Sequence, residues 1–467
     1  MSSLIDFIRK APITTLIGAD QKSKDLFHLI QSEKVLTKEE VAKAFYEKTM
    51  SRSMVYELLG KLESDVVNSI IQENPSTIPL RANYRYVHRM ECAVKLLDRQ
   101  GDNELAVYLA EKVLKKSILY EFTDLTLSLA ETCRYYFAIT GHRKKFEYYL
   151  ELCTDTAKVM NLEKKAEGLH DQLVFAISQK KSNYDQEERL AQEIYDELTP
   201  AIEKSNRIMV IWGVVGVILY SIKNDHQEGS KICKQVLNHL LPQSDTVYLS
   251  WIFTFLFHLV PSQLKSDKAK DALQYIQEIE KNSQLQRYNK IVLQQYKFIV
   301  AMHAQQLDLS ADSIQALQKM RLNELQKEIF EVHQSYQLLL EGKPLRLARF
   351  LNQVPTYSKD KEGMNINIII IQLLYLIREG KLYAFCDRSP GIQRYLHRYL
   401  KSSPNKRSTF FIQSLLELET SGFDRKKIDR IKSIKKLEKY PYQESPQDFD
   451  IEIVPYEILW QEAMAWL

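Results

Sequence analysis

Three segments with helical periodicity lie between Asp102 and Val159: DNELAVYLAEKVLKKS (102–117), FTDLTLSLAETCRYYFAIT (122–140) and HRKKFEYYLELCTDTAKV (142–159). In each, apolar residues recur three or four positions apart, which predicts an amphipathic helix. The side chains expected to face inward are Leu105, Leu109, Val113 and Leu114, then Leu125, Leu129, Cys133 and Phe137, then Phe146, Tyr149, Leu150, Cys153 and Ala157. Gly101 and Gly141 stand forty residues apart, each just ahead of a new helix. Two helices in a period of that size predict an α-solenoid, in which each pair buries its apolar face against its neighbours.

The composition agrees with a long helical array. The chain has 467 residues, 45% of them hydrophobic and 27% charged, with only 13 glycines and 13 prolines. Few turn-forming residues argue against a many-stranded β fold and against long linkers. The net charge of +4 gives no general reason to expect a nucleic-acid or membrane partner.

Cysteine usage and hydropathy indicate a cytoplasmic location. The five cysteines form no CxxC pair, which favours buried thiols in a reducing compartment over a disulfide framework. The first residues lack a charged, apolar, small-residue leader pattern. The most apolar runs (208–220, 251–260 and 366–377) are shorter than the roughly 20 residues that cross a bilayer, so we expect core helices and no membrane partner.

Residues 1–74 resemble a small winged-helix-like module. A helical pattern in DLFHLIQS (25–32), a capping box from Thr37 to Glu40 and a longer helix after Ser51 follow the order of helix-turn-helix proteins. The outward positions of the third helix are Arg52, Glu57, Lys61, Glu63 and Asp65, with a negative balance. Because DNA readers neutralise phosphates, a capping or docking module is favoured over DNA binding.

Two sets of basic residues are candidate contact sites. Arg81, Arg85 and Arg89 recur every four residues beside aromatic side chains, a pattern that can hold a single strand by charge and stacking. A second patch consists of Arg394, Arg398 and Lys401. For both sets, a solvated helix face is the favoured interpretation and a contact with nucleic acid or a partner is the alternative.

The rest of the chain also has helical periodicity. Helices are expected at roughly 163–180, 187–198, 200–222, 227–240, 246–260, 267–282, 284–308, 310–320 and 322–340. Ser266 is expected to cap the helix that begins near residue 267.

Two later sequence segments resemble a known repeat family. YQLLLEGKPLRLARFLNQV (336–354) has Gly342 before a second helix and Ala348 at a small position, and YLIREGKLYAFCDR (375–388) repeats this with Gly380 and Ala384. Over residues 84–422 the chain resembles the tetratricopeptide-repeat-like superfamily, which implies a right-handed solenoid of helical hairpins. The spacing is nearer forty than the usual 34, and no ligand-binding residue is carried over from the family.

The composition changes after Gly422. DRKKIDRIKSIKKLEKY (424–440) is strongly basic, whereas the last 27 residues hold six acids and no lysine or arginine. We expect residues 423–467 to form a basic helix and an acidic segment that covers the end of the array, since a solenoid end needs a cap.

The sequence contains no phosphate-binding GxxxxGK[ST], no HExxH, no paired CxxC and no GxSxG. We therefore expect no catalytic residues, no cofactor and no metal. The predicted domains are a module at 1–74, a repeat array at 80–422 and the segment at 423–467, in an all-α fold. The expected function is a non-enzymatic scaffold for a protein partner. One alternative is a nucleic-acid-associated regulator that uses its winged-helix-like module, with nucleic acid the less favoured partner; another is an accessory subunit whose partner carries catalysis.

Overall fold

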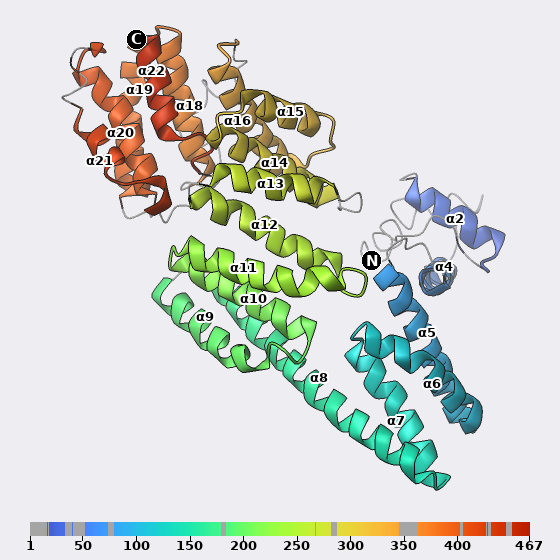
Figure 1. Ribbon diagram of the computed structural model, residues 1–467. Coiled ribbons are helices and arrows are strands. Elements are labelled where there is room, and N and C mark those ends of the chain that lie inside the picture. The colour runs from blue at the N-terminus through green and yellow to red at the C-terminus, as the bar shows by residue number, and fades with distance from the viewer. Residues whose placement is uncertain are drawn as a thin grey trace. The chain divides into compact units, whose positions relative to one another are not determined.

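All regular structure in the described part of the chain is helical (Figure 1). The computed structural model describes residues 16, 18–32, 40, 52–72, 79–178, 184–266, 268–281, 287–344, 363–401, 405–425, 427, 431–444 and 451–467. Over these ranges there are 19 α-helices, with short 3-10 turns and one π-helical segment. The all-α prediction is confirmed.

The chain divides into two compact units: Met1–Asn161 with Asp245–Val247, and Leu162–Ser244 with Tyr248–Leu467. The helices that begin in the first unit are α2 (Gln21–Gln31), α4 (Arg52–Gln72), α5 (Pro79–Gln100), α6 (Asn103–Leu119), α7 (Thr123–Ile139) and α8 (Arg143–Ser178). Those of the second are α9 (Tyr184–Leu198), α10 (Asn206–Ile222), α11 (His226–Leu240), α12 (Leu249–Lys265), α13 (Ala269–Glu280), α14 (Arg287–His303), α15 (Leu307–Gln318), α16 (Glu324–Leu340), α18 (Met364–Arg378), α19 (Leu382–Tyr395), α20 (Lys406–Thr420), α21 (Lys432–Glu438) and α22 (Tyr456–Trp466).

In the first unit, α5, α6 and α7 pack together. α5 contacts α6, α6 contacts α7, and α5 also contacts α7. Gly101 and Gly141, at φ of +87° and +71°, end α5 and α7 as predicted, because glycine adopts the left-handed region without a Cβ clash. This sequential packing is consistent with a helical repeat.

The predicted inward faces are right for α7 and partly wrong for α6 and α8. Leu125, Leu129, Cys133 and Phe137 are buried. Leu105 and Leu150 are instead exposed, by 48% and 41%. In α6 the buried side is made largely of alanine and valine, so the helix carries apolar residues on two sides and its periodicity is ambiguous.

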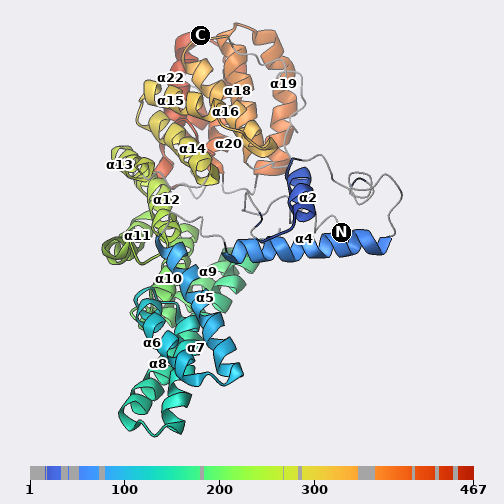
Figure 2. The same cartoon turned by 90° about the vertical axis from the view of Figure 1, so that its right-hand side faces the viewer.

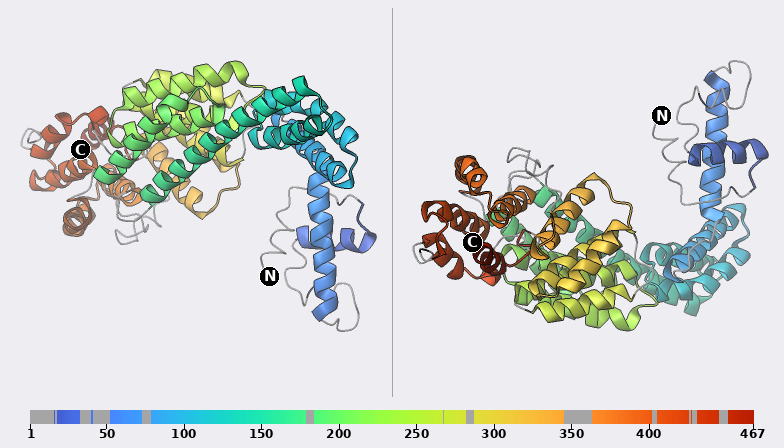
Figure 3. Two further views of the ribbon diagram at one scale, coloured as in Figure 1. Left: turned by 90° about the horizontal axis from the view of Figure 1, so that it is seen from below. Right: turned by 90° about the horizontal axis from the view of Figure 1, so that it is seen from above.

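Helix α8 corrects the expectation of two helices that meet near residue 160. It continues without a break from Arg143 to Ser178, as Figure 3 shows. The segment between the two expected helices, Met160–Leu162, contains neither glycine nor proline, so nothing in the local sequence ends the helix.

The second unit is built from two layers. Each helix from α9 to α16 contacts the next, and α10, α12, α14 and α16 also contact one another in that order. We call α10, α12, α14 and α16 the first layer. A helix with neighbours on several sides must be apolar nearly all round, and α10 (NRIMVIWGVVGVILYSI) is buried at ten of its 17 residues.

The C-terminal helix covers α18, the most buried helix of the second unit. Residues 365–377 of α18 are all buried, and α22 packs against this helix (Figure 2). The expected role of residues 423–467 as a cap on the array stays a prediction.

Ala348 and most of the Thr37–Glu40 capping box, residues 37–39, lie outside the described residues. The middle of the predicted winged-helix-like module, residues 41–51, lies outside them as well. Within the described part of this module, α2 and α4 pack together. Gly342 and Gly380 are described, and both have positive φ at a helix end.

Candidate functional site

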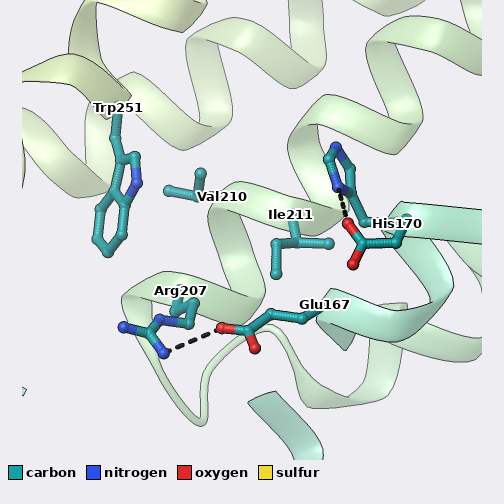
Figure 4. A pocket seen from close by; sticks show the side chains of 7 residues that line it. Glu167, His170, Arg207, Val210, Ile211 and Trp251 are labelled. Carbon is teal, nitrogen blue, oxygen red and sulfur yellow. Dashed lines mark hydrogen bonds and ion pairs between the residues drawn. The ribbon is translucent and has the colours of Figure 1, made fainter. Parts of the chain in front are cut away.

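A pocket opens where three helices of the second unit meet (Figure 4). Its volume is about 450 Å³, and the second half of α8, α10 and α12 supply its walls. The lining residues are Glu167, His170, Asp171, Arg207, Val210, Ile211 and Trp251.

An ion pair forms one edge of the pocket. The Ser205 hydroxyl accepts a hydrogen bond from the Ile208 amide and thereby caps α10, which places Arg207 in the first turn. The Arg207 Nη1 donates to Glu167 Oε1 at 3.0 Å. Lys164 donates to the other oxygen of Glu167 at 2.8 Å. Because this pair is partly exposed, it orients the side chains more than it stabilises the fold.

Trp251 stands opposite the acidic side of the pocket, with Val210 and Ile211 between (Figure 4). The Tyr248 ring meets the indole edge-on at a centroid distance of 4.9 Å, which fixes its orientation. On the far side, His170 Nδ1 lies 3.6 Å from Asp171 Oδ1, and the Asp171 side chain is 83% exposed. The pocket therefore combines an aromatic ring, an apolar floor and a solvated carboxylate.

Half-buried side chains continue from the pocket along the first layer. Ile211, Val214 and Ile218 follow one another on one side of α10, and Trp251, Thr254 and Phe257 do so on α12. The Phe257 ring meets the Tyr296 ring of α14 edge-on at 5.8 Å. We call these seven residues the first-layer row.

A buried polar cluster joins the C-terminal segment to α20. Arg407 and Glu452 are both fully buried: Nε and Nη2 of Arg407 donate to the two carboxylate oxygens of Glu452 at 2.8 and 2.7 Å. Nη2 also donates to Glu457 at 2.7 Å, and Nη1 donates to the Tyr440 carbonyl at 2.6 Å. Each charged atom has a protein partner, so the cluster serves the fold.

The basic residues predicted from sequence fall into different units. Arg81 and Arg89 are exposed and Arg85 is half-buried on α5 of the first unit. Arg394, Arg398 and Lys401 are exposed in the second unit, at the end of α19 and along the π-helix (Leu396–Leu400) that continues it. None of the six lines the pocket of Figure 4.

The pocket residues were missed because they come from three distant segments. Glu167, Arg207 and Trp251 are each about forty residues from the next, with no motif among them. Only the repeat length hints that they could meet, because equivalent positions of successive pairs lie side by side in a solenoid.

The part of the chain that the structure describes contains neither a metal-binding cluster nor a membrane-spanning helix. No cluster of three or more His, Cys, Asp or Glu residues is arranged to hold a metal ion there. No helix in the same ranges is both long and apolar enough to cross a membrane.

Comparison with models of known protein families, with curated proteins and with solved structures gave no match for this chain.

Proposed function

We propose that this chain is a non-enzymatic scaffold, in which a right-handed tetratricopeptide-like array receives a segment of a partner protein on the first-layer row. The observation that carries the proposal is the continuity of the row. Ile211 and Trp251 line one pocket across α10 and α12, and Phe257 and Tyr296 touch across α12 and α14. A line of apolar and aromatic side chains over successive helices matches the apolar side of a bound segment.

The pocket at one end of the row fits a basic side chain with an apolar stem. The Trp251 face attracts a cation, and the exposed Asp171 carboxylate offers a counter-charge on the opposite side. Val210 and Ile211 would contact the methylene groups of a lysine or arginine. The partner segment would then carry apolar residues followed by one cation.

Site-specific photo-cross-linking tests whether a partner protein binds the first-layer row. A benzophenone amino acid at Thr254, in the row, should give a discrete protein adduct in native lysate. The same amino acid at Tyr383, which is 93% exposed on α19, should not. Trp251→Ala should reduce the Thr254 adduct at least tenfold, because a central aromatic anchor contributes about 2 kcal/mol or more.

The alternatives give different results in the same experiment. Triple replacement of Arg81, Arg85 and Arg89 by glutamine should leave the protein adduct intact. A nucleic-acid adduct in its place, lost in that triple variant and resistant to salt, would favour the regulator. A captured enzyme that loses activity without this chain would make the chain an accessory subunit.

A further inference from the structure

A second pocket lies at the C-terminal end of the second unit, between the π-helix, α20 and α21. Its volume is about 520 Å³, within the range of roughly 300–1,000 Å³ typical of small-molecule sites. Two buried leucines, Leu396 and Leu416, form part of its lining, and glutamine and threonine side chains supply neutral polar groups. The pocket is separate from the first-layer row.

The π-helix shapes one wall. His397 and Lys401 line the pocket together with Gln393, which comes before the π-helical segment. π-helical turns are rare and frequently mark functional sites, because the inserted residue re-aims the side chains around it.

The pocket is lined by two lysines and one carboxylate, so positive charges outnumber negative ones. Lys401 and Lys436 line it, and neither forms an ion pair within the described residues. The Lys436 ammonium lies 5.9 Å from the centre of the Phe410 ring. The carboxylate that shares the pocket, Glu417, is already engaged. It accepts hydrogen bonds from the Lys432 and Ser433 amides at 2.8 and 3.2 Å and from the Ser433 hydroxyl at 2.6 Å.

The flanking sequence strengthens the positive field. Residues 378–401 contain six lysines or arginines against two acids. Fields of one sign over a concave site raise the local concentration of the opposite ion.

We propose that this pocket binds a small phosphorylated molecule. Lys401 and Lys436 would hold the phosphate, and Leu396 and Leu416 would contact the uncharged remainder. A phosphomonoester carries a charge of about −1.5 to −2 at pH 7, and the two lysines outnumber the Glu417 carboxylate in the pocket that would receive it. Lysine is a common point-charge partner of phosphate.

Isothermal titration of the full chain tests the proposal, with inorganic phosphate, adenosine monophosphate and adenosine as probes. We expect both phosphate compounds to bind and adenosine to bind at least tenfold more weakly than its monophosphate. Lys401→Gln and Lys436→Gln should each weaken binding roughly tenfold, the effect of losing one charge-assisted contact. Gln413→Trp should weaken it too, because the indole fills the pocket without changing its charge.

The matched control is the double variant Lys406→Gln/Lys439→Gln. Both lysines are exposed on α20 and next to α21, and neither lines the pocket. The affinity for phosphate compounds should stay within about twofold of that of the unmodified chain, because salt in the solvent screens exposed charges outside the pocket. The proposal is overturned if no phosphate compound binds, or if the control variant weakens binding as much as Lys401→Gln. Tight binding of a single-stranded oligonucleotide alone, weakened equally by every lysine variant, would overturn it in favour of a nucleic-acid surface.

Discussion

Arg407 is the largest fully buried side chain of the described residues, and it is charged. A guanidinium is tolerated in a core only when carboxylates and carbonyls satisfy it, as Glu452, Glu457 and Tyr440 do here. Removing one partner of such a buried pair lowers the stability of the fold, because the remaining charge is then buried without a counter-charge.

Arg407→Met should therefore destabilise the second unit by about 3–5 kcal/mol. The double variant Arg407→Met/Glu452→Gln should lose less than the sum of the two single variants, because the carboxylate left unpaired by the first change is neutralised by the second. Urea unfolding followed by circular dichroism measures both. Arg207→Met is the control: its pair with Glu167 is partly exposed, so the expected loss is about 0–1 kcal/mol. Equal losses at Arg407 and Arg207 would contradict this account.

One buried histidine, His333, and two half-buried ones, His226 and His303, make the fold sensitive to acid. Burial lowers the pKa of His333 to about 3, and burial also lowers the pKa of His226 and His303 to about 4. In the unfolded chain each has a pKa near 6.5. Between these values the unfolded state binds protons that the folded state does not, so stability falls as the pH falls from about 6.5 to about 4.

His333→Phe should reduce that acid sensitivity. The imidazole stacks on Phe298 at a centroid distance of 4.6 Å, so a benzene ring fits the same packing. Each histidine contributes a slope of up to about 1.4 kcal/mol per pH unit. We expect the difference in unfolding free energy between pH 7 and pH 5 to shrink by about 1–3 kcal/mol in the variant. An unchanged difference would mean that His333 takes up a proton in the fold.

At the scale of the elements, two glycines set how closely α10 approaches its neighbours. A Cβ built on Gly213 would lie 2.7 Å from Val236 of α11 and 2.8 Å from Phe255 of α12. A Cβ on Gly216 would lie 2.7 Å from Ile232 and 2.8 Å from Tyr195 of α9. The small residues thus allow one helix to pack against three others.

Gly213→Ala should destabilise the second unit by about 1–3 kcal/mol, because overpacking outweighs the better helix propensity of alanine. The matched control is Gly168→Ala in α8, where a Cβ meets nothing within 4 Å. At Gly168 only the higher helix propensity of alanine changes stability, and we expect the free energy of unfolding to rise by about 0.5–1 kcal/mol. The melting temperatures of both variants measure these effects. A higher melting temperature for Gly213→Ala would show that α10 can move away from its neighbours.

Sequence patterns predicted which segments are helical better than they predicted where each helix ends or which side of it is buried. The positive φ at Gly101 and Gly141 was predictable, but Glu121, Asn224 and Gln305 occupy the same kind of helix end without glycine. Asparagine adopts the left-handed region more readily than most residues, so Asn224 carries a weak local signal, whereas Glu121 and Gln305 carry none. Ser266, expected to cap α13, ends α12 instead, and Lys268 is the N-cap of α13.

The candidate sites were predictable only in part. Lys401 was recognised in a basic run, and the structure adds Lys436 of α21 to the same pocket. Glu167 and Trp251 are separated by more than eighty residues, and the sequence assigns no function to either. Pairings across that distance depend on which turns of successive helices face one another, which periodicity does not specify.

At the scale of the second unit, the C-terminal segment ties together the ends of first-layer helices. Lys265 and His303 are the last residues of α12 and α14. Lys265 Nζ lies 4.0 Å from the centre of the Tyr442 ring and donates to its carbonyl at 3.3 Å, and the Tyr442 ring lies 4.8 Å from that of His303. His303 Nε2 is hydrogen-bonded to the Glu452 carbonyl at 2.8 Å. A cation at a helix C-terminus is favourable, so Lys265 also suits the dipole of α12.

Tyr442→Ala should consequently loosen α12 and α14 at their C-terminal turns rather than α20 alone. The substitution removes the ring that Lys265 and His303 share, and each end then frays more readily. Hydrogen exchange followed by mass spectrometry should show faster exchange for peptides that end near residues 265 and 303. Helices α5 to α7, in the other compact unit, serve as an internal reference, and Tyr383→Ala removes an exposed tyrosine as the matched control. If exchange rises only around residue 442, the segment covers the array without holding it, and the stability of α12 and α14 comes from their packing with α11 and α13.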